Sequence, residues 1–186
     1  EAQGIAKQLN LEPIVATPPL YHLIQRDSER ELIPAAQDSG VGLIPYSPLG
    51  GGMMTGKFRF EEEPEKGTRM DYRQGTDGPR FWHQKGFEVA NVLQEVSDAS
   101  GISMARLAIG WVLKHKTVAS VIVGARNADQ LDQTIDMGEQ DIPADVFEEL
   151  ERRTRPDIDY LTWFMNRSAQ RHYEAGELQA DKIERL

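Results

Sequence analysis

The sequence contains no cysteine, which excludes disulfide bonds and thiolate metal sites and favours a cytoplasmic protein. No apolar run approaches the roughly 20 residues that a membrane-spanning helix needs, and the polar N-terminal residues do not form a secretory signal peptide. Basic residues are scarce, with 21 lysines and arginines against 30 acidic residues. The resulting net charge of -9 argues against a nucleic-acid surface.

The remaining composition is that of an ordinary globular domain. The 186 residues are 39% hydrophobic and 27% charged, which suits one sizeable domain. Ala2, Ile5, Ala6 and Leu9 recur at helical spacing from the first residues onward. Because the chain begins with Glu1, inside this helical pattern, we expect it to be a fragment of a longer protein.

Short apolar runs alternate with amphipathic segments along the chain. The apolar runs predict strands, and a long polar excursion over 59–79 predicts a functional or disordered loop. Ser103 and Asn127 are expected to cap helices, with Gln130 at capping-box spacing from Asn127. The predicted strands are 13–17, 41–46 and 119–125, and the predicted helices are 1–9, 29–37, 81–100, one that follows Ser103, one that follows Asn127, and 143–153.

This alternation predicts an α/β fold built from parallel βα units. Three open parallel strands leave two exposed edges, and a closed (β/α)₈ barrel typically takes about 250 residues. We therefore interpret the chain as the last three βα units of a TIM barrel, over residues 1–155, with a tail over 156–186. Trp111 is expected in the core, and Trp163 and Phe164 are expected to anchor the tail.

One stretch, "IPYSPLGGGMMTGKF" at 44–58, approaches a phosphate-binding P-loop through Gly51-x-x-x-x-Gly56-Lys57. The P-loop needs a serine or threonine after the lysine to ligate magnesium, and here Phe58 occupies that position. A P-loop also leads directly into a helix, whereas Pro64 and Gly67 interrupt the charged segment after Phe58. The nucleoside-triphosphate interpretation is therefore rejected.

The same stretch still suits an extended anionic ligand. Functional groups of a barrel gather at the carboxyl ends of its strands, where Ser47, Lys57 and the amides of 49–52 are expected to contact phosphates. Arg126 precedes the Asn127-capped helix, so its guanidinium suits a phosphate monoester. Tyr46, at the strand mouth, offers a flat face to an aromatic ring.

These residues, in this order, resemble the aldo-keto reductase family, and the resemblance covers nearly all of residues 1–153. Each matching piece is weak alone, and the ordered set at correct spacing is specific. The sequence looks most similar to the branch of bacterial reductases and potassium-channel β-subunits. The matching stretches are "YHLIQRDSERELIP", "GVGLIPYSPLGGGMMTGKF", "RLAIGWVLKHKTVASVIVGARNADQL" and "IPADVFEELE".

The resemblance implies an NADP(H)-dependent barrel enzyme that reduces small aldehydes or ketones. By position, Tyr46 would stack on the nicotinamide, Arg126 would bind the adenosine 2′-phosphate, and Gln130 would hold the adenine ribose end. The residues expected to hold the pyrophosphate are Ser47, Leu49, Gly51 and Lys57. The family's catalytic Asp, Tyr, Lys and His lie in its N-terminal half, so no catalytic residue is assigned here, and we expect the isolated chain to be inactive.

The sequence departs from the family at two cofactor positions. Pro18 stands where a glutamine usually contacts the nicotinamide amide, so that contact is lost or supplied by Thr17. Thr134 stands where an asparagine usually contacts adenine. No metal site is predicted, because the four histidines, His22, His83, His115 and His172, show no metal-ligand spacing.

Two other functions stay open from the sequence. One is a non-catalytic NADP(H)-sensing subunit that regulates a partner protein. The other is an unrelated barrel enzyme whose phosphate substrate binds at strands 7 and 8. Neither the carbonyl substrate nor the oligomeric state follows from the sequence.

Overall fold

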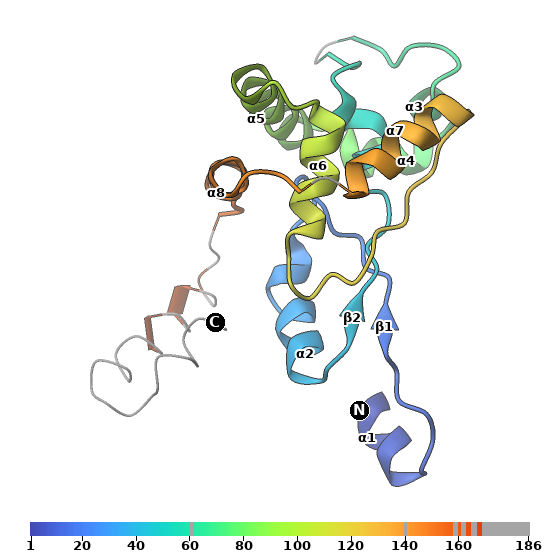
Figure 1. Ribbon diagram of the computed structural model, residues 1–186, viewed down its shortest axis with the longest axis vertical. Helices are drawn as coiled ribbons and strands as arrows, with labels where there is room; N and C mark the ends of the chain where they lie inside the picture. Colours follow the sequence, from blue (N-terminus) through green and yellow to red (C-terminus); the bar gives the residue numbers. More distant parts are fainter. Residues whose placement is uncertain (60–61, 140, 158–159, 161–162, 165–166, 169–186) are drawn as a thin grey trace.

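A computed structural model describes residues 1–59, 62–139, 141–157, 160, 163–164 and 167–168 of the chain. No helix in these ranges is long and apolar enough to cross a lipid bilayer. The elements, shown in Figure 1, are α1 (Ala2–Gln8), β1 (Ala16–Thr17), η1 (Asp27–Glu29), α2 (Leu32–Asp38), β2 (Gly42–Leu43), η2 (Gly50–Thr55), α3 (Arg69–Tyr72), α4 (Gln74–Phe81), α5 (Gln84–Ser100), α6 (Met104–Leu113), α7 (Ala128–Glu139) and α8 (Ala144–Arg153).

Strands β1 and β2 lie side by side and run parallel (Figure 1), with Ala16 opposite Gly42 and Thr17 opposite Leu43. Backbone hydrogen bonds continue the pairing beyond these strands. The amides of 42, 44 and 46 donate to the carbonyl oxygens of 15, 17 and 19 at 2.9, 2.9 and 3.1 Å. The first two predicted strands therefore form, although only two residues of each have regular strand geometry.

The third predicted strand, over 119–125, is wrong as a regular strand, although its start pairs with the other side of β2. Leu43 donates to the Thr117 carbonyl oxygen, and Ala119 donates back to the Leu43 carbonyl oxygen, both at 2.8 Å. The next bond, from Ile122 to Pro45 at 2.7 Å, spans one residue more on this segment than on its partner. Such an extra residue is a bulge, which interrupts the ladder.

Both outer edges of this small parallel sheet carry exposed apolar side chains. Beside β1, Ile14 is 47% and Val15 72% exposed, and on the far segment Ile122 is 49% exposed. Within the described residues, no further strand pairs with either edge. The arrangement is a sector of parallel βα units with two unpaired sides.

Helices α5, α6 and α8 supply much of the core, and the sequence predicted all three, although α5 begins at Gln84, later than the predicted start at 81. In α6 the apolar residues at helical spacing are all buried, namely Met104, Leu107, Ala108, Trp111 and Val112. The Ser103 hydroxyl accepts a hydrogen bond from the Arg106 amide, so Ser103 is the expected N-cap. Gly101 ends α5 with a φ of 70°, a left-handed conformation that glycine adopts without strain. Helix α8 begins after Pro143 as expected.

The excursion over 59–79 contains α3 and most of α4, so the prediction of a loop was wrong. Thr68 caps α3 by accepting from the Asp71 amide. Helix α4 forms despite Gly75, Gly78 and Pro79, because Asp77 is fully buried and held by several arginines. The burial of Asp77 and its ion pairs here outweigh the poor helix propensity of the local sequence.

Two smaller predictions also need correction. Helix α2 begins at Leu32, later than the predicted start at residue 29, and Leu32 itself is exposed. Trp163 and Phe164 are each 48% exposed, so they do not anchor the tail in the core. They lie near Tyr160, and the remaining tail prediction falls largely outside the described residues.

Gly110 in α6 provides a test of the core packing. A Cβ atom at this position would lie 2.6 Å from Cγ2 of buried Ile142. Gly110→Ala is expected to lower the free energy of unfolding by about 1–3 kcal/mol through overpacking, even though alanine favours helices by about 1 kcal/mol. Urea-induced unfolding of the complete protein would measure this.

Gly75 in α4 is the matched control. It has no neighbouring atom within 4 Å of the added Cβ, so Gly75→Ala should leave stability unchanged or raise it. Equal effects of the two substitutions would contradict the close packing of α6 against Ile142.

Candidate functional site

The chain turns sharply where the central strand segment ends. Ser47, directly after Tyr46, has a φ of 57°, which is uncommon for a residue other than glycine. Gly50, Gly51 and Gly52 also have positive φ values, and the Gly50 amide donates to the Ser47 carbonyl oxygen at 2.8 Å. Glycine adopts such values without strain, so only Ser47 is strained here, and strained backbone gathers at ligand sites. The loop sits at the strand mouth, as the sequence predicted.

Glycine is required at two places in this loop for different reasons. At Gly51 a Cβ would lie 3.1 Å from the Phe81 ring and 3.3 Å from Met70 Cε, so α3 and α4 press directly on the loop. At Gly52 a Cβ would lie 2.8 Å from Cε and 2.9 Å from Nζ of Lys57. The absence of side chains lets Lys57 fold back over the loop, next to the strand mouth.

Not all amides of the loop are available to a ligand. The Gly52 amide donates to the Leu49 carbonyl oxygen at 3.0 Å, and the Gly50 amide is used by Ser47. The expectation that all amides of 49–52 face a phosphate is therefore wrong for Gly50 and Gly52. Leu49 and Gly51 stay candidates.

The positive charge of Arg126 acts on Lys57. Partial burial lowers the pKa of Lys57, and the nearby charge of Arg126 lowers it further, against a smaller opposing effect of Glu65. Among the described residues, neither cation forms an ion pair with a carboxylate. An anion between two such cations would relieve their repulsion.

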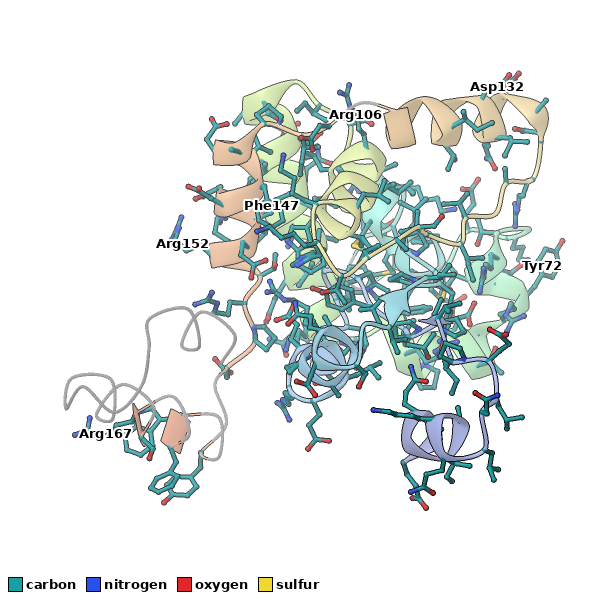
Figure 2. The ribbon with its side chains drawn as sticks, turned by 60° about the horizontal axis from the view of Figure 1, so that its bottom comes forward. Tyr72, Arg106, Asp132, Phe147, Arg152 and Arg167 are labelled. Atoms are coloured by element: carbon teal, nitrogen blue, oxygen red, sulfur yellow. The ribbon has the colours of Figure 1, made fainter. Side chains whose placement is uncertain are left out.

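The start of α7 is organised by side-chain hydrogen bonds. Asn127 Oδ1 accepts from the Gln130 amide at 2.9 Å, which confirms the predicted cap. Gln130 Oε1 accepts from the Arg126 amide at 3.0 Å, rather than from Asn127 as a capping box requires. Thr134 Oγ1 donates to the Gln130 carbonyl oxygen at 2.7 Å. Arg126, Gln130 and Asp132 are exposed, and Figure 2 shows Asp132 on the outside of α7.

Tyr46 is half-buried at the centre of the site. Its backbone bridges Leu20 on one side and Ile122 on the other. Its hydroxyl accepts a hydrogen bond from Arg80 Nη2 at 3.3 Å, and the Arg80 guanidinium lies over its ring, 5.7 Å from the centroid. The ring therefore has a charged neighbour from α4.

The sequence did not predict this arginine or the carboxylate that holds it. Asp77 is fully buried and forms ion pairs with Arg69, Arg73 and Arg80 at 2.8, 3.3 and 3.7 Å. The i,i+4 and i,i+3 spacing of Arg73, Asp77 and Arg80 was the available signal. It was hidden because Gly75, Gly78 and Pro79 indicated a loop.

The described histidines have structural surroundings. His22 is buried, and burial, together with the charge of Arg80, lowers its pKa to about 3, so the ring is neutral. His83 Nδ1 accepts from the Gly86 amide at 3.1 Å and caps α5. His115 packs against Trp111 and Phe147. His172 lies outside the described residues.

A shallow hollow of about 230 Å³ lies away from this loop, between the start of α5 and the end of α8. It is lined by residues such as Lys85, Glu88 and Arg153 and contains none of the predicted cofactor residues. This hollow is therefore separate from the candidate site at the strand mouth.

Comparison with known proteins identifies the protein family of this chain. The profile of the aldo/keto reductase family matches residues 3–154. The chain belongs to the aldo/keto reductase family, a family of oxidoreductases with a (β/α)₈ fold. This confirms the resemblance seen in the sequence and removes the alternative of an unrelated phosphate-binding barrel.

Individual relatives have different named activities. An L-glyceraldehyde 3-phosphate reductase of Escherichia coli O157:H7 is 34% identical over 128 residues, which are 66% of this chain and 36% of that protein. The versiconal hemiacetal acetate reductase of Aspergillus parasiticus is 31% identical, over 72% of this chain and 38% of that protein. A probable voltage-gated potassium channel subunit beta of Arabidopsis thaliana is 31% identical, over 73% and 42%. The chain thus spans well under half the length of these relatives.

Proposed function

We propose that this chain is the cofactor-binding part of an NADPH-dependent reductase of aldehydes or ketones, and that it forms the last three βα units of the barrel. One observation carries the proposal: a glycine loop at the mouth of the central strand packs against the Lys57 side chain, whose pKa is lowered by burial and by the charge of Arg126. The exposed edge residues, such as Val15 and Ile122, fit a barrel whose other strands come from elsewhere in the complete protein.

The residues present fit a dinucleotide. The amides of Leu49 and Gly51 are candidates to donate to phosphate groups, and the glycine at position 52 lets Lys57 place a positive charge beside the loop. Arg126 at the start of α7 suits a terminal phosphate, which the 2′-phosphate of NADPH provides. The residues proposed to bind NADPH are Tyr46, Ser47, Leu49, Gly51, Lys57, Arg126, Gln130 and Thr134.

When bound, NADPH supplies the hydride for the reduction. This chain's contribution is to bind and orient the cofactor, with Tyr46 against the nicotinamide and the two cations against the phosphates. We propose that the acid that protonates the carbonyl oxygen comes from an upstream tyrosine of the complete protein. The substrate is proposed to be a small carbonyl compound, in keeping with the reductases among the relatives.

The complete protein is expected to oxidise NADPH when it is offered a broad panel of aldehydes and ketones. The measurement is the loss of NADPH absorbance, with product identification for each substrate that reacts. A protein that binds NADPH but turns over no member of the panel would contradict the reductase proposal.

That same outcome would support a second candidate, a non-catalytic NADP(H)-sensing subunit that regulates a partner. The probable potassium channel β-subunits among the relatives favour this alternative. The upstream sequence discriminates between the two, because a regulatory subunit can lack the tyrosine or histidine of the catalytic set.

A further inference from the structure

Arg80, which lies over the Tyr46 ring, forms an ion pair with the buried carboxylate of Asp77. Asp77 is fully buried, yet its three partners are arginines that are each partly exposed. Burying a carboxylate is costly unless it is paired, so this carboxylate is retained together with its cations. Within this cluster one negative charge therefore faces three positive charges.

The two carboxylate oxygens of Asp77 have different partners. Oδ2 accepts from Arg69 Nε at 2.8 Å and also pairs with Arg73 at 3.3 Å. Oδ1 has no hydrogen-bond partner among the described residues and faces Arg80 Nη1 at 3.7 Å. Arg69 and Arg73 thus fix the carboxylate, and the carboxylate holds Arg80 through its second oxygen.

Arg80 is also confined by aromatic rings. Its guanidinium lies 5.1 Å from the centroid of the Phe81 ring and 5.7 Å from that of Tyr46, and Nη2 bonds the Tyr46 hydroxyl. A tyrosine side chain rotates about two bonds, and these contacts restrict both its ring and its hydroxyl end. Such preorganisation lowers the entropy lost when a ligand binds.

We propose that Arg80, held by Asp77, is a positioning residue that fixes one face and the hydroxyl of Tyr46, so that the opposite face is presented to the nicotinamide ring. The inference rests on the proposed NADPH-binding function. It gives α4 a role, since this helix carries the arginine that sets the nicotinamide end of the site. Arg80 acts through Tyr46 and is not expected to touch the cofactor phosphates.

The test compares two probes on the complete protein. NADPH carries the nicotinamide, whereas adenosine 2′,5′-bisphosphate carries only the adenine, the ribose and the phosphates of that end. Arg80→Ala is expected to weaken NADPH binding roughly three- to tenfold, from one cation–π contact and one hydrogen bond, and to leave bisphosphate binding unchanged. Titration calorimetry measures both affinities.

Matched variants test whether Arg80 affects NADPH binding through Tyr46. Arg73→Ala also removes an Asp77 ion pair but no contact with Tyr46, so it should leave the affinity ratio of the two probes unchanged. In a protein that already carries Tyr46→Ala, Arg80→Ala should cause no further loss of NADPH affinity, because the residue through which it acts is gone. Should Arg80→Ala fail to fold, Arg80→Lys keeps the charge beside Asp77 but loses the planar guanidinium, and it should shift the ratio in the same direction.

Three results would overturn the inference: equal weakening of both probes, unchanged NADPH binding, or the same loss in the Tyr46→Ala background. A wild-type protein that binds neither probe would instead refute the proposed function, and the inference with it. Binding of both probes with an unchanged ratio in Arg80→Ala would refute the inference alone.

Discussion

Arg126→Ala in the complete protein is expected to weaken NADPH binding by at least about tenfold and to leave NADH binding nearly unchanged. Arg126 is exposed at the start of α7, next to the Asn127 cap, where a helix end favours anions. A guanidinium grips a phosphate with two parallel bonds, and a hydrogen bond to a charged group contributes roughly 1.5–3 kcal/mol. Only NADPH has the 2′-phosphate, so the ratio of the two dissociation constants is the quantity to measure.

Two further variants sharpen this test. Arg126→Lys keeps the charge but loses the planar guanidinium with its parallel donors. Its NADPH affinity should therefore lie between those of the wild type and Arg126→Ala. Lys57→Ala should weaken NADPH and NADH alike, because both cofactors carry the pyrophosphate. If Arg126→Ala instead weakened both cofactors equally, Arg126 would support the fold and would not read the 2′-phosphate.

The parts of the fold that the sequence predicted are those with a strong local signal. Helices α5 and α6 carry wide apolar stripes, and their boundary is marked by Gly101 and Ser103, whose preferences are local. The order of parallel segments was also predictable, because alternating strands and helices leave few topologies.

The parts that were missed depend on pairing and burial that local propensity does not describe. The bulge between Ala119 and Ile122 is set by pairing with Leu43 and Pro45, which the sequence of 119–125 does not contain. Helix α4 exists because Asp77 is buried among arginines, whereas its own glycines and proline predict a loop. At the bulge, tertiary pairing overrides local propensity, and at α4 the burial of Asp77 with its ion pairs does so.

The residues of the candidate site also differ in whether a local sequence signal predicts them. Tyr46, Gly51 and Lys57 lie within one short stretch, so their spacing alone predicted a loop at a strand mouth. The nearness of Lys57 and Arg126 joins residues far apart in the sequence and was expected from the barrel topology. Arg80 was missed because its significance comes only from its contact with Tyr46 in space.

The largest expected effect on stability lies outside the site, at the buried arginine Arg26. Its side chain is 2% exposed and joins the loop after β1 to α8. The guanidinium donates to both carboxylate oxygens of Glu29, to the Thr154 hydroxyl at 3.1 Å and to a carboxylate oxygen of Glu151, and it lies 4.8 Å from the centroid of the Trp111 ring. Trp111 Nε1 in turn donates to Glu151 at 3.1 Å.

Arg26→Ala is expected to lower the free energy of unfolding of the complete protein by about 3–5 kcal/mol, because Glu29 and Glu151 would stay partly buried without their cation. The control is Arg152→Ala on α8, whose pair with Glu149 is formed by a 71% exposed side chain that points outward in Figure 2. Exposed pairs contribute about 0–1 kcal/mol, so this control should leave stability nearly unchanged. Urea-induced unfolding, followed by circular dichroism and tryptophan fluorescence, measures both variants. Similar small losses for both would show that the Arg26 network is replaceable by water and does not join the strand-end loop to α8.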